Sequence, residues 1–420
     1  MRDLAVFLSG MRVGTLSQAA GLRFVYDEEY LAREGSTPLS LSMPLRGAPY
    51  GNRVTRAWVE GLLPGDLRVR ARVAARGYVK VTNPLAVLSI IGLDCPGAVQ
   101  VCRVDRSEEV ARDGLLVPVD DSWIGARLAL LRRDEAAWQV ADERWSLSGG
   151  QSKFALARGE DGQWYDPRGA APSTHIIKPG VHHAKHQALN EHISLSALRG
   201  VGVPSARTRY VEFDGEPAVV VERFDRVRRG GTVLRRHAED LCQALGNQTI
   251  YERDGGPTAT QILDLLGDRA GKRSKLRFVE ALIGTYLLGS PDGHARNYSV
   301  LLEGEQAALA PLYDVASSLP YDIADSGIMT LRTIAIAIGG EHTFGMVGLA
   351  QWQRFFATNS IDADWGIDTI KRQATRLPDA LADAFAELTG VAATDELRPR
   401  YVDAVARSCR QVLQGAKWRG

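Results

Sequence analysis

Three polar side chains in the second half of the chain have the types and the spacing that phosphoryl transfer requires. Asn297 follows Asp292 by five residues, and Asp314 comes seventeen residues later. In such a reaction one carboxylate orients the attacking hydroxyl, while an amide and a second carboxylate hold Mg²⁺ against the phosphates. Asp and Asn are also ordinary loop residues. For Asp292 and Asn297 alone, a polar loop is therefore the simpler interpretation.

Two patterned runs would position these side chains. An apolar run at 281–288 predicts a helix that ends just before Asp292. A β-branched run at 298–302 predicts a short hairpin, near 298–311, between Asn297 and Asp314. Both acidic residues would then lie at the ends of regular elements.

A second candidate segment is rich in serine and glycine. Residues 145–158 read WSLSGGQSKFALAR, which predicts a strand, a glycine turn and a second strand. Glycines let a backbone approach phosphates closely, and the free N–H groups of such a turn can bind them. The nucleotide-binding candidates in this loop are Ser148, Gly149, Gly150, Gln151 and Lys153.

The same loop contains LSGGQ, which also matches the signature of ABC-type ATPases. That class requires a G-x-x-x-x-G-K-[ST] loop upstream, and the sequence contains none. We therefore discount this interpretation.

A lysine and a glutamate follow the glycine loop. A predicted strand over 175–178 ends in Lys178, and an amphipathic helix over 187–199 carries Glu191. In kinases a strand lysine contacts the nucleotide phosphates and pairs with a helix glutamate. For either residue alone, a solvated surface charge is the simpler interpretation.

A possible hinge comes next. A hairpin turning at Asp214-Gly215 ends in VVVERFDR, residues 219–226. An apolar strand that runs into alternating polar and aromatic residues suits a connection between two lobes. There, the backbone of Glu222 to Phe224 could bind an adenine.

The distribution of elements predicts the fold class. Strands precede residue 225, and helices follow it apart from the hairpin near 298–311. This segregation predicts a bilobal α+β architecture with a β-rich small lobe and an all-α large lobe. Glycine loop, lysine, glutamate, hinge, Asp-x-x-x-x-Asn and metal-binding Asp follow the order of the protein-kinase fold. The predicted regions are an α+β subdomain (1–105), the small lobe (106–225) and the helical large lobe (226–420).

Composition limits the class of protein. The 420 residues suffice for two or three domains. The 51 basic residues nearly balance the 50 acidic ones, so a net charge of +1 gives no overall attraction to nucleic acid or to a membrane. Four scattered cysteines without C-x-x-C spacing fit a reducing cytosol. No apolar run approaches the ~18 residues of a membrane span. We expect a soluble, cytoplasmic protein.

The chain departs from conventional protein kinases in ways that indicate one family. His294 follows the catalytic Asp, and Tyr313 precedes the metal-binding Asp. The sequence resembles the HipA-like serine/threonine kinases, the toxins of type II toxin–antitoxin pairs. The motifs that carry the resemblance are SLSGGQSKFAL (146–156), HIIKPG (175–180), VERFDR (221–226), HAEDLCQALG (237–246), PDGHARNYSVLL (291–302) and LAPLYDVASS (309–318).

The resemblance implies a role for each matching residue. Asp292 would be the catalytic carboxylate, with His294 lining the nucleotide site beside it. Asn297 and Asp314 would bind Mg²⁺. The remaining roles are phosphate binding by Lys178, adenine binding by Glu222 and Phe224, and orientation of the lysine by Glu191. In the family a glycine-loop serine is autophosphorylated and thereby switches the kinase off, which indicates Ser146, with Ser148 as the alternative.

The resemblance also implies partners. The N-terminal subdomain would contact a cognate DNA-binding, HipB-like antitoxin, so that DNA is reached only through that partner. The protein substrate would be an aminoacyl-tRNA synthetase, free or tRNA-bound, or another translation protein. For a tRNA-bound target, Arg226, Arg228 and Arg229 could meet RNA phosphates. The segment 316–340, equivalent to a kinase activation segment, does not identify the target.

Two alternatives remain. A D-x-H-x-x-N core also resembles phosphoinositide kinases, which would make the protein a lipid or small-molecule kinase. A protein without catalytic activity could instead act as a corepressor that binds an antitoxin. The presence of Lys178, Asp292, Asn297 and Asp314 argues against lost activity.

Overall fold

The computed structural model describes residues 1–420 except 1–2, 113, 140–141, 182–183, 322–331 and 416–420. The chain forms two compact units, each built from three stretches of sequence. Unit 1 comprises Met1–Gly180, Val211–Gln248 and Ser299–Ala310, and unit 2 comprises Val181–Tyr210, Thr249–Tyr298 and Pro311–Gly420. The predicted activation-segment equivalent lies partly outside the described residues.

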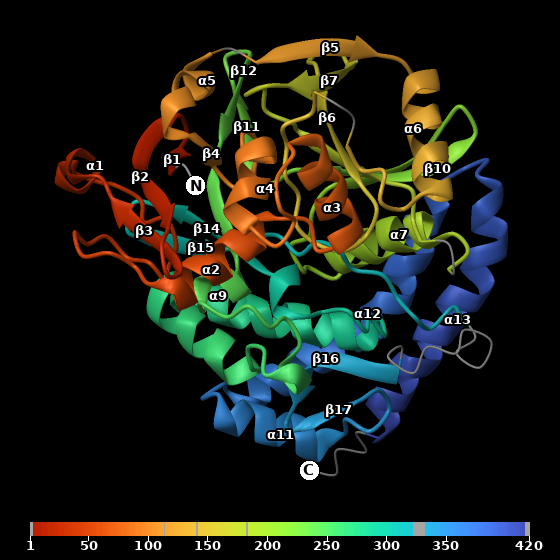
Figure 1. Ribbon diagram of the computed structural model, residues 1–420. Coiled ribbons are helices and arrows are strands. Elements are labelled where there is room, and N and C mark those ends of the chain that lie inside the picture. The colour runs from red at the N-terminus through yellow and green to blue at the C-terminus, as the bar shows by residue number, and fades with distance from the viewer. Residues whose placement is uncertain (1–2, 113, 140–141, 182–183, 322–331, 416–420) are drawn as a thin grey trace. The chain divides into compact units, whose positions relative to one another are not determined.

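The N-terminal part of unit 1 is a four-stranded antiparallel sheet in the order β3-β2-β1-β4 (Figure 1). Gly10, at φ 80°, makes the predicted turn between β1 and β2. Helices pack on the sheet, and Trp58 of α2 is fully buried in the core that they share with the strands. The elements are β1 (Leu4–Leu8), β2 (Met11–Gln18), β3 (Leu22–Tyr26), α1 (Glu28–Ala32), α2 (Asn52–Leu62), α3 (Leu67–Arg76), α4 (Pro84–Ile91), β4 (Val99–Arg103), η1 (Val104–Arg106) and α5 (Glu108–Ala111).

The predicted start of α4 is confirmed. The side chain of Asn83 accepts a hydrogen bond from the Ala86 N–H at 3.2 Å, and Pro84 occupies the first turn. An N-cap side chain satisfies a donor that the helix itself cannot, and proline has no N–H to satisfy there. Residues 39–43 have the apolar alternation that predicts a strand, but that prediction is wrong, because Ser40 and Met43 pair across a tight turn.

The second sheet contains the predicted lysine strand and has the order β5-β7-β6-β8-β10-β9. β8 lies between β6 and β10 and is antiparallel to both. The strands and the helix beside them are β5 (Leu115–Val119), α6 (Asp121–Arg133), β6 (Phe154–Arg158), β7 (Trp164–Arg168), β8 (His175–Lys178), β9 (Thr208–Phe213) and β10 (Glu216–Glu222).

Unit 1 is completed by a hairpin and a small sheet. β11 (Arg226–Arg229) pairs with β12 (Thr232–Arg235), and a three-stranded sheet has the order β13-β14-β15. Its strands, with the short helix after the first, are β13 (His237–Asp240), α8 (Leu241–Ala244), β14 (Ser299–Glu303) and β15 (Gln306–Leu309). The hairpin predicted near 298–311 is confirmed. The sequence pattern predicts a helix over 237–245, but α8 starts only at Leu241, because residues 237–240 pair with β14.

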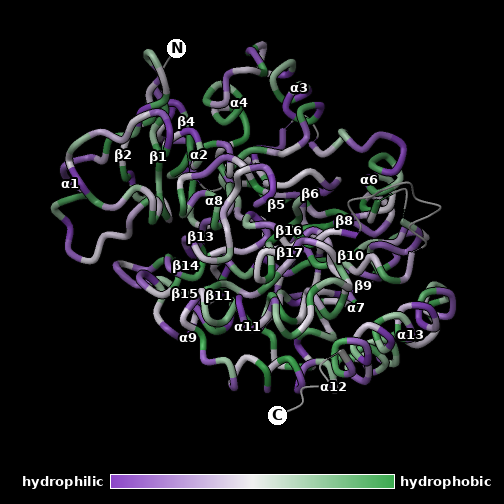
Figure 2. The backbone as a smooth tube through the Cα atoms, turned by 90° about the horizontal axis from the view of Figure 1, so that it is seen from below, coloured by the Kyte–Doolittle hydropathy of each residue, from purple (hydrophilic) through white to green (hydrophobic). Residues whose placement is uncertain are grey.

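Unit 2 is mainly helical. α12 packs against α7, α9 and α13, and hydrophobic and hydrophilic residues alternate along α12 and α13 (Figures 1 and 2). Thr258 caps α9 as predicted, and Gly271, at φ 76°, interrupts it. The elements are α7 (Gln187–Gly200), η2 (Glu252–Asp254), α9 (Ala259–Leu287), η3 (Ala295–Asn297), β16 (Thr333–Ile338), β17 (Glu341–Thr343), α11 (Leu349–Thr358), α12 (Ala363–Ala386) and α13 (Ala392–Gly415). No helix of the described part is long and apolar enough to cross a membrane.

Candidate active site

In unit 2, Asp292 lies in the turn that follows α9, and its side chain is 58% exposed. The Asn297 side-chain amide donates to the Asp292 backbone carbonyl at 2.7 Å. The His294 N–H donates to the same carbonyl at 2.9 Å. The five-residue spacing therefore closes a turn. Because this bond uses the amide nitrogen of Asn297, the amide oxygen is the atom with which that residue would bind a metal.

His294 lies beside the carboxylate of Asp292. Its Nε2 is 3.7 Å from Asp292 Oδ1, and its side chain is 9% exposed. Burial lowers the pKa of His294, although the charges of Asp292 and Asp314 oppose the shift. The imidazole is therefore neutral at pH 7. Its Nδ1 is buried and has no hydrogen-bond partner among the described residues.

Asp314 is tied to the same turn through its neighbour. The Tyr313 hydroxyl donates to the backbone carbonyl of Arg296, next to Asn297, at 2.8 Å. Asp314 has a φ of 59°, the left-handed region that Asp tolerates better than most residues. Beyond it, the Ser318 N–H donates to the Gly289 carbonyl at 2.9 Å. Unit 2 thus brings Asp292, His294, Asn297 and Asp314 together.

A tyrosine outside every predicted set joins this group. The Tyr251 hydroxyl donates to Asp292 Oδ1 at 2.7 Å. Its ring meets the His294 ring edge-on, with centroids 5.0 Å apart at 81°. Tyr251 precedes Asp292 by 41 residues, so no local spacing pattern could have indicated the contact.

In unit 1, Lys178 ends β8 in the middle of the second sheet and is 5% exposed. It pairs with Val219 of β10. Glu222 ends β10 and is exposed, and Phe224 is half-buried in the next turn. The sheet therefore places the lysine strand beside the predicted hinge strand. Glu191 is fully buried in α7 of unit 2, so its pairing with Lys178 stays a prediction.

The glycine loop is fastened to the N-terminal part of unit 1. The Gly65 N–H donates to the Gly149 carbonyl at 2.7 Å, and the Ser146 N–H donates to the Asp94 carbonyl at 3.0 Å. Because the residues before the loop make these contacts, the first of the two predicted strands does not form. The prediction of that strand is wrong. β6 forms as expected after the loop.

Side chains of the glycine loop also make contacts within unit 1. Ser146 is fully buried, and its hydroxyl donates to the Leu62 carbonyl, whereas Ser148 is half-buried. Lys153 Nζ donates to the Ser148 carbonyl at 2.8 Å and lies over the Trp138 ring. The exposed part of the loop is its glycine tip, Gly150, next to Gln151.

A buried charge cluster includes Arg223, Asp225 and Arg226, which belong to the predicted hinge segment. Asp94 Oδ1 accepts hydrogen bonds from Arg226 and Arg235, each at 2.9 Å. Arg223 pairs with Asp225 at 2.8 Å, and its Nη1 is 3.6 Å from Asp94. Burial opposes ionisation of Asp94, but the surrounding arginines outweigh it and lower its pKa. The carboxylate therefore stays charged inside the protein.

This cluster corrects one interpretation of the basic segment. Arg226 is 8% exposed and is held by Asp94 and Asp225, so it cannot meet RNA phosphates without leaving the core. Arg228 and Arg229 are exposed, as a nucleic-acid contact would require.

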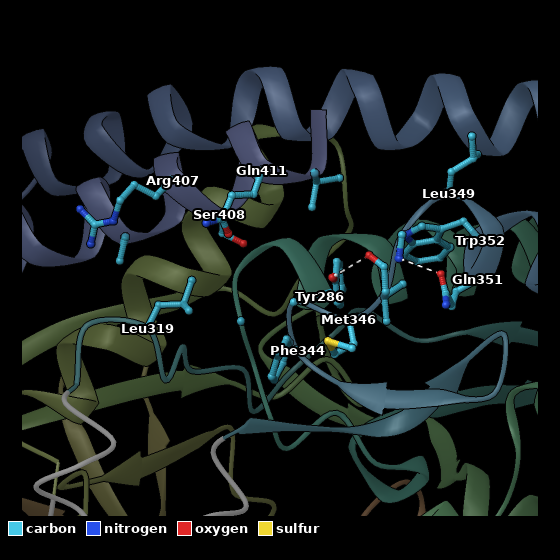
Figure 3. A pocket seen from close by; sticks show the side chains of 16 residues that line it. Tyr286, Leu319, Phe344, Met346, Leu349, Gln351, Trp352, Arg407, Ser408 and Gln411 are labelled. Atoms are coloured by element: carbon cyan, nitrogen blue, oxygen red, sulfur yellow. Dashed lines mark hydrogen bonds between the residues drawn. The ribbon is translucent and has the colours of Figure 1, made fainter. Parts of the chain in front are cut away.

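Unit 2 also contains a cavity of about 530 Å³ (Figure 3). Arg407, Ser408 and Gln411 project into it from α13, opposite the apolar side chains of Tyr286 and Met346. No predicted site residue lines this cavity. Within the described residues, no cluster of three or more His, Cys, Asp or Glu side chains could hold a metal ion by itself.

Comparison with known proteins identifies the class. A family model for the HipA-like C-terminal domain matches residues 145–388, and one for the HipA N-terminal domain matches residues 4–102. The fold resembles a solved chain from the complex of HipA, HipB and operator DNA of Shewanella oneidensis. The TM-score is 0.84 at 24% identity, covering 98% of this chain and 97% of that one. The architecture is thus a protein-kinase-like fold, as predicted.

Curated relatives agree with the family models. A putative kinase, Y4mE, of Sinorhizobium fredii is 32% identical over 92% of both chains. The serine/threonine-protein kinase toxin HipA of Shewanella oneidensis is 28% identical over 91% of this chain and 89% of that protein. The chain belongs to the HipA-like family, and the resemblance drawn from its motifs is confirmed.

Proposed function

We propose that the protein is an ATP- and Mg²⁺-dependent serine/threonine protein kinase that acts as a growth-arresting toxin. The observation that carries this proposal is the turn that joins Asp292, His294 and Asn297, with Asp314 attached to it through Tyr313. The names of two relatives, a putative kinase and a serine/threonine kinase toxin, support the same activity.

In this reaction Asp292 accepts the hydrogen bond of a serine or threonine hydroxyl. Its exposed side chain can be reached by a macromolecular substrate. The neutral His294 beside it does not neutralise the carboxylate. Asp292 therefore keeps the charge with which a hydroxyl is oriented and its proton received.

The residues present fit a nucleotide with Mg²⁺. This ion is usually bound by one or two carboxylates together with substrate phosphates, so Asp314 and the amide oxygen of Asn297 suffice on the protein side. Bound there, Mg²⁺ would neutralise charge on the phosphates. The unpartnered Nδ1 of His294 is a buried polar atom that a ligand in this place would satisfy.

Unit 1 would supply the nucleotide contacts. Lys178 would bind the phosphates, and the glycine loop, through Ser148 to Lys153, would cover them. Glu222 and Phe224 would hold the adenine. The position of Lys178 supports a fixed lysine, because β8 is paired with strands on both sides and Lys178 itself pairs with Val219 of β10.

Autophosphorylation in the glycine loop is proposed as the off-switch. Ser146 is the assigned residue and Ser148 the alternative. Because the Ser146 hydroxyl is buried against Leu62, this serine can accept a phosphoryl group only after the loop has left its place. A phosphate then adds up to about two negative charges. The loop could not return to its buried position.

A DNA-binding, HipB-like antitoxin is the proposed partner, with DNA contacted through it. The solved chain with the same fold comes from a complex with HipB and operator DNA, which supports this assignment. The proposed substrate is an aminoacyl-tRNA synthetase or another protein of translation.

One labelling experiment tests the activity. The purified protein is incubated with radiolabelled ATP and Mg²⁺, alone and with cell extract, beside Asp292→Ala. Asp264→Ala, an exposed aspartate on α9, is the matched control. We expect label on the protein itself and on a protein target. Asp292→Ala should lower the rate by about 10²- to 10⁴-fold, and the control should not change it. Label confined to lipids, or near-normal turnover in Asp292→Ala, would refute the assignment.

A further inference from the structure

Tyr251 has no role in the reaction described above, yet its hydroxyl is hydrogen-bonded to the carboxylate of Asp292. Its hydroxyl donates to Oδ1 at 2.7 Å, whereas the nearest nitrogen of His294 is 3.7 Å away. Burial, together with the charge of Asp292, raises the pKa of Tyr251. The phenol therefore stays protonated and remains a donor at physiological pH.

The hydrogen bond from Tyr251 to Asp292 matters because Asp292 lies on an exposed turn. Packing does not restrict a side chain that is 58% exposed, so its rotamer depends on specific partners. Tyr251 approaches from one side, and its ring also rests edge-on against His294. A carboxylate held in this way presents a constant direction to an incoming hydroxyl.

The position of Tyr251 is itself fixed by the turn that follows it. The Gly256 N–H donates to the Tyr251 carbonyl at 2.8 Å, and Tyr251 is the N-cap of η2. Glu252, the next residue, accepts a hydrogen bond from the Ala337 N–H at 2.7 Å. Ala337 belongs to β16, the strand that ends the segment predicted to correspond to an activation segment.

We propose that Tyr251 is a positioning residue for phosphoryl transfer, which holds Asp292 through its hydroxyl and is itself held by β16 through Glu252. This inference rests on the proposed kinase activity. β16 is thus connected to the catalytic carboxylate by two hydrogen bonds. One joins the Ala337 N–H to Glu252, and the other joins the hydroxyl of the adjacent Tyr251 to Asp292. Movement of β16 would change how Asp292 meets its substrate without any change in the nucleotide contacts.

Tyr251 takes no part in the bond changes. The substrate oxygen forms a bond to the γ-phosphorus of ATP, and the bond from that phosphorus to the β–γ bridging oxygen breaks, releasing ADP. The substrate proton passes to the carboxylate of Asp292. The phenolic proton of Tyr251 stays on its oxygen throughout. Removing the Tyr251 hydroxyl should therefore alter the orientation of Asp292 and not the bond changes.

The test begins with Tyr251→Phe, which deletes only the hydroxyl. Steady-state phosphorylation of a protein substrate should show kcat lowered by about 10- to 100-fold, because misplacement of a reacting group has effects of this size. KM for ATP should be unchanged. Tyr286→Phe is the matched control, since it removes a phenol that donates to the Val347 carbonyl at 3.2 Å in the same unit. Its kcat should equal that of the wild type.

Two further variants separate positioning from a structural effect. In an Asp292→Asn background, Tyr251→Phe should cause no additional loss, because its effect passes through the carboxylate. Glu252→Ala should lower kcat with unchanged KM for ATP, and Glu252→Gln, which keeps an acceptor oxygen, should restore it. A merely structural role would not leave KM for ATP unchanged while kcat falls.

The outcomes are distinguishable. If wild-type protein transfers no phosphate, the proposed kinase activity fails and the inference falls with it. If wild-type protein is active and Tyr251→Phe matches it in kcat, only the role of Tyr251 is overturned. An equal loss from Tyr251→Phe in the wild-type and Asp292→Asn backgrounds also overturns the role, since the tyrosine would then act elsewhere.

Discussion

Replacing Asp94 by asparagine should destabilise the protein by about 3–5 kcal/mol at pH 7, the usual cost of removing one partner from a buried ion pair. Asp94 is 1% exposed and accepts hydrogen bonds from Arg226, Arg235 and the Ser173 hydroxyl. Asparagine has nearly the same shape, so no cavity forms. What changes is charge: buried guanidinium groups lose the carboxylate that compensates them.

The pH dependence follows from the direction of the pKa shift. The folded-state pKa of Asp94 lies below the 3.8 of an exposed aspartate. Its contribution is therefore fully present above about pH 4 and is lost as pH falls toward the folded-state pKa. The difference in unfolding free energy between wild type and Asp94→Asn should be constant from pH 5 to pH 7. It should shrink by roughly 1.4 kcal/mol per pH unit below about pH 4.

Urea unfolding followed by tryptophan fluorescence measures this difference, because Trp145 pairs with Asp94 in a backbone bridge and is buried. Asp105→Asn is the matched control, since Asp105 pairs with Arg103 at the surface. An exposed pair contributes only about 0–1 kcal/mol. Equal effects of the two substitutions, or a difference for Asp94→Asn that does not change below pH 4, would refute the reasoning.

Three further predictions concern unit 1. Gly97→Ala should cost about 2–4 kcal/mol in thermal or urea unfolding, since φ is +69° and a Cβ would lie 2.4 Å from the Ala238 carbonyl oxygen. Ser146→Ala should abolish self-labelling in phosphopeptide maps while Ser148→Ala preserves it; the reverse pattern would move the site to Ser148. Lys178→Met should weaken ATP binding by about tenfold or more in calorimetry, with an unchanged unfolding midpoint, because it would remove the proposed charge-assisted hydrogen bond to the phosphates.

Sequence reasoning succeeded where the determining contacts are local. The cap of α4 by Asn83 involves residues three apart, and the turn at Gly10 depends on one glycine. The resemblance to the family was also readable, because its motifs are contiguous stretches. The set Asp292, Asn297 and Asp314 was selected from spacing. In unit 2, Asp292 and Asn297 share one turn, and Asp314 is attached to that turn through Tyr313; their roles stay a prediction.

It failed where distant partners decide the structure. Residues 237–240 were predicted as helical, but they find strand partners in β14, about sixty positions later. The segment before the glycine loop has a strand-like composition, yet its backbone is bonded to Asp94 and not to a hairpin partner. In both places a tertiary partner overrides the local preference.

The buried charge cluster is another feature that depends on distant partners and that the sequence did not predict. It holds the segment that was predicted to be the hinge. Along residues 222–225, Glu222 is exposed and Phe224 half-buried, while Arg223 and Asp225 are buried. The chain turns here, and the Arg226 N–H donates to the Arg223 carbonyl at 3.3 Å. The inward residues bond to the N-terminal part of unit 1, Arg223 to the Cys95 carbonyl and Asp225 to the Gly97 N–H.

Glu222 and Phe224, the candidates for adenine binding, are therefore not positioned by β10 alone. The inward face of the same stretch is fixed by ionic hydrogen bonds to residues 94–97, which lie in the region matched by the HipA N-terminal domain model. Because charge-assisted hydrogen bonds are strong and directional, a shift of that region would be transmitted to Phe224. Nucleotide affinity in this chain should depend on the N-terminal part of unit 1, even though none of its residues is assigned to the nucleotide.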